Sequence, residues 1–364
     1  AVALRSWKNI VLLLLAFSPA IFTAHLIWTK AVDVAAWDEW ETASTLVKWH
    51  DGTLTWGDLY AAQIQHRMVV PRLLTIALAH LSGGDFRWNV YACVTLVLLN
   101  SALLWTLLQR TMAGSPWRWP LMFAFNLLLF CPLHYETQFW GSSMWGGIPM
   151  PCLLAALIVL TPRTRTAGET LNPAQSWGRF AAALLLAEIA THSFANGLAM
   201  WPVLLLLILI NPALGPLRTR LIQGGLWLVA AGLTLWAYFT NFINVAFHAY
   251  NLKPGDHAMK GASNLLEGDH LRLSFDFVRG YFGAWFARSP FVDHPLEDAI
   301  FLGSITLLIF ALLMGFAILS RRMRAQWSSL LPWMGLGFYA LTVGLMISKR
   351  AADTGVHRAV MTRY

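Results

Sequence analysis

Long apolar runs recur along the whole chain and are separated by short polar segments. An α-helix needs about 20 mostly apolar residues to cross a bilayer. The pattern therefore predicts an all-α polytopic membrane protein with about 9–11 transmembrane helices. The nine clearest candidates are residues 9–29, 88–108, 119–135, 148–161, 178–194, 197–211, 221–243, 298–319 and 330–348.

Two further stretches are ambiguous, because 69–82 is short and 273–287 contains the charged residues Asp276 and Arg279. Cytoplasmic loops are enriched in Lys and Arg. If neither stretch crosses and the N-terminus is cytoplasmic, every short Arg-rich connector lies inside, whereas the outer connector 134–147 contains no Lys or Arg. Residues 69–82 are therefore predicted to form an amphipathic helix along the outer interface.

This topology makes residues 1–364 a single transmembrane domain with its polar segments outside. The outer segments are a first loop with juxtamembrane helices at 30–87, a second large loop at 244–297 and a tail at 349–364. The chemistry is expected in these segments. The chain has no initiator methionine and ends at Tyr364, so we expect the natural protein to extend further at one or both ends.

Composition narrows the function classes. The chain is 57% hydrophobic and 12% charged, with a net charge of +8. In a membrane protein, excess basic residues are expected at lipid headgroups and cytoplasmic loops. The positive charge therefore does not indicate nucleic acid as a partner. The three cysteines lack the spacing of a disulfide framework or a CxxC site. No phosphate-binding loop, HExxH or GxSxG is present. An enzyme of this layout would take an activated substrate from the membrane, and a lipid-linked donor fits that need.

An acidic, tryptophan-bordered segment follows the first span, with Asp38, Glu39 and Glu41 beside Trp37 and Trp40. Crowded acids raise one another's pKa, so one of them could accept a proton from an acceptor hydroxyl while the indoles pack against a sugar face. An interfacial helix with an aromatic belt and solvated acids explains the same residues.

The order of features adds to this interpretation. The acidic pair past the first span, the expected helix QHRMVVPRLL at 65–74, and Gly83-Gly84 followed by Arg87 together resemble the GT-C superfamily of membrane glycosyltransferases. The resemblance is one of layout and short motifs over roughly residues 1–200. It implies a polyprenyl-phosphate or polyprenyl-pyrophosphate sugar as donor and Asp38 as catalytic base, with Glu39 as competitor. HRMVVPR replaces the His/Pro-Pro-Leu start of protein mannosyltransferases, and no WWDYG-type motif is present, so the acceptor class stays open.

The second outer connector adds Glu136 and Trp140 on the same side. The resemblance implies that Glu136 assists a metal or orients substrate; it could equally cap a helix or pair with Arg67. Asp38 and Glu136 are the candidate ligands if Mg²⁺ or Mn²⁺ is a cofactor. Glu188 and His192 share one helical face, as a functional pair or as a hydrogen-bonded packing pair.

A lipid phosphate requires fixed cations at the outer interface, and arginine can hold it bidentately. Arg279, Arg358 and Arg363 are the candidates, and the terminal Thr-Arg-Tyr looks like the arginine-bearing loop found late in GT-C enzymes. Solvated or headgroup-contacting arginines explain them as well. His66 and Arg67 complete the predicted substrate-binding set.

The expected function is that of an inverting glycosyltransferase of the cell inner (plasma) membrane, with its site facing the periplasm or exterior. It would transfer a sugar to a hydroxyl of a glycan, lipid or protein during synthesis of a cell-envelope polysaccharide. A lipid flippase or solute transporter, with Glu188, His192 and Arg279 as a polar path, is the alternative. Acyl transfer at His66 or His192 has no supporting motif.

Overall fold

A computed structural model of the chain describes residues 7–63, 66–131, 138–162, 171–240, 269–287, 295–320, 326–348 and 356. The described residues are mostly α-helical, with one two-stranded sheet formed by β1 (Ala62–Gln63) and β2 (His66–Arg67). The chain forms two compact units. The first consists of Ala1–Ala62, His66–Arg163 and Gly178–Gly197, and the second of Gln63–Gln65, Thr164–Trp177 and Leu198–Tyr364.

Six helical segments in the described part of the chain are long and apolar enough to cross a membrane, which confirms the prediction of an all-α multi-pass membrane protein. They match six of the nine predicted spans. The segments are Asn9–Lys30 within α1 (Trp7–Lys30), α5 (Arg87–Thr111), Gly141–Leu160, α12 (Leu217–Phe239), α16 (Pro295–Leu319) and α18 (Trp327–Ser348). Gly141–Leu160 comprises η2 (Gly141–Ser143), α8 (Met144–Gly147) and α9 (Pro149–Leu160).

The other three predicted spans are helical but do not reach this standard. Residues 119–135 give α6 (Arg118–Leu129), which has only 12 residues. Residues 178–194 overlap α10 (Pro173–Thr191), whose early turns are polar. Residues 197–211 give η3 (Ala195–Ala199) and α11 (Met200–Ile210), a shorter apolar segment that is followed by η4 (Pro212–Leu214).

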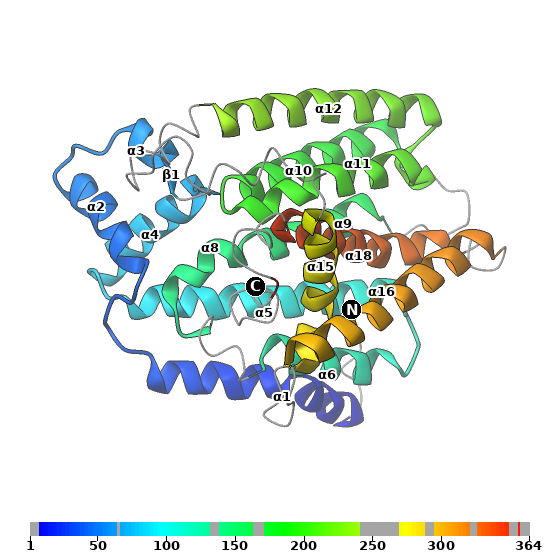
Figure 1. The fold of residues 1–364 in the computed structure, drawn as a ribbon, viewed down its shortest axis with the longest axis horizontal. Helices are drawn as coiled ribbons and strands as arrows, with labels where there is room; N and C mark the ends of the chain where they lie inside the picture. The colour runs from blue at the N-terminus through cyan, green and yellow to red at the C-terminus, as the bar shows by residue number, and fades with distance from the viewer. Residues whose placement is uncertain are drawn as a thin grey trace. The chain divides into compact units, whose positions relative to one another are not determined.

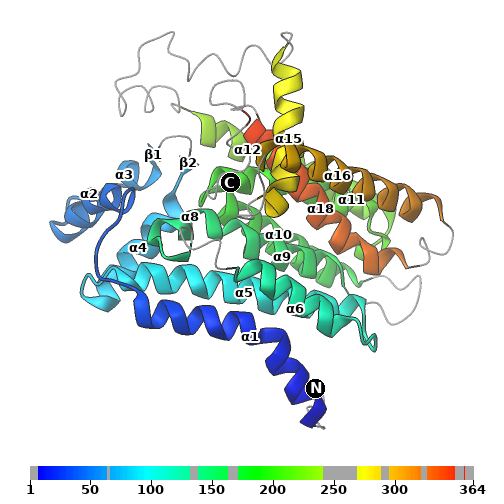
Figure 2. The ribbon, with the colours of Figure 1, turned by 60° about the horizontal axis from the view of Figure 1, so that its bottom comes forward.

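In the first unit, α1, α5 and α6 run side by side (Figure 2). A buried amide fixes this packing: the side chain of Asn126 donates to the Ala16 carbonyl over 2.7 Å and accepts from the Ser101 hydroxyl over 2.6 Å. Each of these three residues belongs to a different helix, so the amide ties all three helices together.

The first loop folds into three helices, α2 (Glu39–His50), α3 (Trp56–Tyr60) and α4 (Val69–Ser82). Both α2 and α3 pack on α4, which in turn contacts α5 (Figure 1). The helix over 69–82 is confirmed, and its place at a membrane interface stays a prediction. The helix expected from residue 65 onward is wrong, because β2 occupies His66–Arg67. Starting at Val69 puts Pro71 in the first turn, where its missing N–H costs no helical hydrogen bond.

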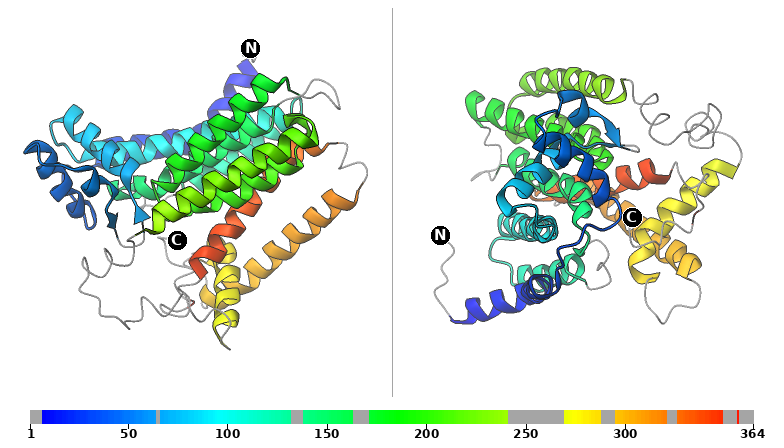
Figure 3. Two further views of the ribbon diagram at one scale, coloured as in Figure 1. Left: turned by 90° about the horizontal axis from the view of Figure 1, so that it is seen from above. Right: turned by 90° about the vertical axis from the view of Figure 1, so that its left-hand side faces the viewer.

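In the second unit, α15 (Asp269–Ala287) packs closely on α16 and also contacts α18 (Figure 3). Gly283 of α15 and Gly303 of α16 lie at this contact, and a Cβ on either would overlap backbone atoms of the other helix. Small residues are what allows two helix backbones to approach in this way. α11 and α12 pack together as well, where the Trp227 indole N–H donates to the Trp201 carbonyl over 2.9 Å.

Candidate functional site

The two acids at the start of α2 have different environments. α1 ends at Lys30, and an irregular segment leads to a turn at Trp37 and Asp38, after which Glu39 begins α2. Glu39 is buried, with 3% of its surface exposed, whereas Asp38 is partly exposed and makes no side-chain capping hydrogen bond. The neighbouring indoles of Trp37 and Trp40 are 58% and 64% exposed. The structure thus gives different environments to two acids that only the resemblance had distinguished.

The Glu39 carboxylate is held by two donors. Its Oε2 accepts the backbone N–H of Ala36 over 2.9 Å, and its Oε1 accepts the side-chain amide of Asn89, on α5, over 3.5 Å. Burial raises the pKa of Glu39 above its ordinary value, and these two hydrogen bonds act in the opposite direction. The main cause is therefore burial rather than the crowding of acids that the sequence suggested.

Trp140 and Gly141 enclose the same carboxylate. The Trp140 indole N–H donates to the Ala36 carbonyl over 3.1 Å, and a Cβ at Gly141 would overlap Glu39 Oε1. The buried thiol of Cys93 lies 3.5 Å and 3.4 Å from the carbonyl oxygens of Trp140 and Gly141. We call Ala36, Glu39, Asn89, Trp140 and Gly141 the Glu39 cluster.

Trp37 has an uncommon backbone conformation. Its φ is +48°, and it is the only non-glycine residue with a positive φ in the part of the chain that the structure describes. Bulky residues rarely adopt this region, which costs about 1–3 kcal/mol and persists only where the surroundings enforce it. The Trp37 ring meets the Trp140 ring edge-on at 5.6 Å. The residue directly before Asp38 is therefore held in a strained state.

A second polar group lies in the same unit and consists of Tyr60, Arg67, Glu188 and His192, the Tyr60 cluster. Arg67 is buried; it donates to the Tyr60 carbonyl over 2.7 Å and its guanidinium lies 4.6 Å from the centre of the Tyr60 ring. Burial raises the pKa of Tyr60, the Glu188 charge raises it further, and Arg67 lowers it. The Tyr60 and His192 ring centres are 5.9 Å apart.

Glu188 and His192 form the pair that their spacing predicted, with His192 Nδ1 3.4 Å from Glu188 Oε2. Their side chains are 35% and 21% exposed, so the pair is accessible. Nearby, His66 stacks on Phe194 at 3.8 Å, and its Nδ1 accepts the N–H of Ala195 over 3.2 Å. This acceptor role fixes which nitrogen of His66 carries the proton when the ring is neutral.

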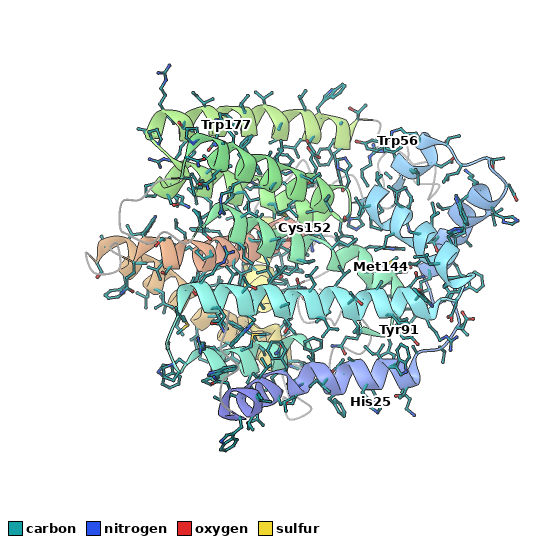
Figure 4. The ribbon with its side chains drawn as sticks, turned by 180° about the vertical axis from the view of Figure 1, so that it is seen from behind. His25, Trp56, Tyr91, Met144, Cys152 and Trp177 are labelled. Carbon is teal, nitrogen blue, oxygen red and sulfur yellow. The ribbon has the colours of Figure 1, made fainter. Side chains whose placement is uncertain are left out.

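An apolar cluster connects the Glu39 and Tyr60 clusters. Met68, next to Arg67 in sequence, packs with Cys93, Met144 and Trp145, and Phe194 packs against them. Figure 4 labels Met144, on the ribbon of α8 beside α5. The first loop is thus attached by side-chain packing to the start of the Gly141–Leu160 segment.

The remaining predicted site residues are either in the second unit or not described. Arg279 belongs to the second unit, where it pairs with Asp276, lies 3.4 Å from the Ser304 hydroxyl and 5.0 Å from the centre of the Phe275 ring. A lipid phosphate at Arg279 would have to share it with Asp276. Glu136, Arg358 and Arg363 lie outside the described residues.

Within the described ranges, no group of three or more His, Cys, Asp or Glu side chains is arranged to hold a metal ion. Because Glu136 is not among the described residues, Mg²⁺ or Mn²⁺ binding by Asp38 and Glu136 stays a prediction.

Sequence reasoning missed Asn89, Cys93 and Tyr60. Asn89 alone had a detectable signal, as a polar residue in the first turn of an apolar span. No protein-family model, curated protein or solved structure matches this chain, so the site itself has to carry the functional argument.

Proposed function

We propose that the protein is a membrane glycosyltransferase that transfers a sugar from a polyprenyl-phosphate or polyprenyl-pyrophosphate carrier to an acceptor hydroxyl. The reaction would take place at the outer face of the inner (plasma) membrane. The observation that carries the proposal is the pair of adjacent acids directly after the first span, of which one is buried and hydrogen-bonded and the other is partly exposed between exposed indoles.

In this mechanism Asp38 is the general base. Its carboxylate removes the proton from the acceptor hydroxyl, and the hydroxyl oxygen attacks the anomeric carbon of the donor. The bond from that carbon to the phosphate oxygen breaks, and the lipid phosphate leaves with the electron pair. A single displacement inverts the anomeric centre. Glu39 is less suited to this role because its carboxylate is enclosed by Ala36, Asn89 and Gly141.

The exposed indoles of Trp37 and Trp40 are suited to pack against a sugar ring beside the base. The charge that develops on the leaving phosphate requires cations, and Arg279, Arg358 and Arg363 stay the predicted candidates for this role. Arg67 is buried against Tyr60, so we assign it to the support of the first loop rather than to direct phosphate contact.

The test compares Asp38→Asn and Glu39→Gln with the wild type in proteoliposomes that contain polyprenyl-phosphate hexoses and an envelope-glycan extract as acceptor. Release of free polyprenyl phosphate measures transfer. We expect Asp38→Asn to lose about 10²-fold or more in rate and Glu39→Gln to retain most activity. Asp51→Asn, at the exposed far end of α2, is the matched control. Unimpaired transfer by Asp38→Asn would refute the base assignment.

A transporter or flippase is the second candidate, and the Tyr60 cluster is the observation in its favour. Burying ionisable residues is costly, so a group of them often marks a substrate or proton path. The same proteoliposomes separate the two functions. Movement of labelled lipid across the bilayer without a new glycosidic bond, and with equal rates in wild type and Asp38→Asn, would favour transport.

A further inference from the structure

We infer that Glu39 and Trp140 are positioning residues, which hold residues 36–39 (the Ala36–Glu39 turn) in the one conformation that presents Asp38 to substrate. This inference rests on the proposed function of Asp38 as general base. It gives Trp140, which the sequence placed among the substrate-binding candidates, a supporting task instead.

Hydrogen bonds converge on Ala36 from two parts of the chain. Its N–H donates to the Glu39 carboxylate over 2.9 Å, and its carbonyl accepts both the Glu39 N–H over 3.0 Å and the Trp140 indole over 3.1 Å. Trp140 is 104 residues further along the chain. The turn that precedes α2 is therefore fixed by a distant segment, and its local sequence alone does not determine it.

The segment that provides these contacts is itself held in place. The thiol of Cys93, in α5, lies within hydrogen-bonding distance of the carbonyl oxygens of both Trp140 and Gly141. Gly141 has no space for a side chain because Glu39 and the Cβ of Asn89 fill it. Movement at Gly141 is therefore coupled to the Glu39 carboxylate and so to the turn.

The positive φ of Trp37 shows that the turn is under strain. A bulky residue stays in this region only where surrounding contacts determine the backbone. Removing the Trp140 hydrogen bond should let Trp37 relax toward an ordinary φ, and Asp38, as the next residue, would rotate with it. Misplacing a catalytic group by about 1 Å can lower a rate about 10²-fold. The effect should fall on kcat, because the exposed indole of Trp40 lies within α2 and outside the turn.

Trp140→Phe tests this, since it keeps an aromatic ring beside Trp37 and removes the N–H donor. We expect kcat to fall about tenfold or more with KM within about twofold. Glu39→Ala should show the same loss, whereas Glu39→Gln keeps an oxygen for the Ala36 N–H and should retain activity. Trp117→Phe, with 68% of its surface exposed, is the matched control.

A second readout does not depend on activity. Labelling of carboxyl groups with carbodiimide and glycine ethyl ester, read by mass spectrometry, reports how enclosed each acid is. In the wild type Asp38 should react and Glu39 should be protected; in Trp140→Phe the labelling of Glu39 should rise. Gly141→Ala disturbs the turn from the other side and serves if Trp140→Phe yields no folded protein.

The two readouts separate the two ideas. If the wild type transfers no sugar from any donor, the proposed function fails, and the labelling alone decides on the positioning. In that case, a Glu39 that is protected in the wild type and labelled in Trp140→Phe supports the positioning role. Wild-type kcat or wild-type labelling in the folded Trp140→Phe protein overturns it.

Discussion

Replacing Gly141 by alanine tests the packing of the Glu39 cluster directly. The added methyl would overlap Glu39 Oε1 and lie 2.6 Å from Asn89 Cβ. Neither neighbour can move easily. The Asn89 Cβ is attached to the backbone of α5, and the other oxygen of Glu39 is bound to the Ala36 N–H. The substitution should therefore force the buried carboxylate or the start of the Gly141–Leu160 segment out of place.

The expected cost follows from these contacts. Overpacking a well-filled site costs about 1–3 kcal/mol. If the carboxylate moves away, the hydrogen bond from Ala36 to a charged acceptor is lost as well, which is worth about 1.5–3 kcal/mol. For a chain of 364 residues, a loss of about 2 kcal/mol or more corresponds to a fall in Tm of about 2–3 °C or more.

The assay is thermal unfolding of the purified protein in detergent, followed by tryptophan fluorescence. Gly178→Ala in α10 is the matched control, because no neighbouring heavy atom lies within 4 Å of the added Cβ. Alanine is favoured over glycine in a helix by about 1 kcal/mol, so this control should keep or raise Tm. A Gly141→Ala protein with the Tm of the wild type would refute the described contact between Gly141 and Glu39.

Two further predictions concern stability. Burial raises the pKa of Glu39 above 4.5, so the folded state binds this proton more tightly than the unfolded state does. The stabilisation from protonated Glu39 is present below pH 4.5 and is lost as pH rises through the raised pKa. The Tm of the wild type, measured relative to that of Glu39→Gln, should therefore fall over that pH range. A Tm difference that stays constant with pH would contradict this. Gly283→Ala should lower Tm, because its Cβ would overlap Ala299 of α16. Gly315→Ala is the control and should not lower Tm, because no neighbouring heavy atom lies within 4 Å of its Cβ. Equal Tm values for the two variants would argue against close packing of α15 on α16.

Hydropathy predicted much of the fold, because a membrane span is encoded in the local sequence. Six spans lie where the apolar runs placed them, and 69–82 is a helix. Hydropathy could not place the ends of shorter helices, which depend on local polar residues and turns. It also gave no sign of the β1–β2 pair, whose strands have only two residues each.

For the candidate site, sequence located the acids but not their roles. Asp38 and Glu39 are adjacent and equally acidic, and which of them is buried depends on the turn at Trp37. Trp140 donates a hydrogen bond to Ala36 in that turn, a contact between distant residues that leaves no local pattern. The Glu188–His192 pair, in contrast, was predictable, because residues four apart on a helix share a face.

The central claim is that this chain binds a lipid-linked sugar and uses Asp38 to consume it. Mass spectrometry of lipids that co-purify with the wild type and with Asp38→Asn tests it most directly. The account predicts that Asp38→Asn retains a polyprenyl-phosphate or polyprenyl-pyrophosphate sugar that the wild type converts to the lipid phosphate or pyrophosphate without sugar. Bulk phospholipid alone in both preparations, or the same intact sugar lipid in both, would contradict it.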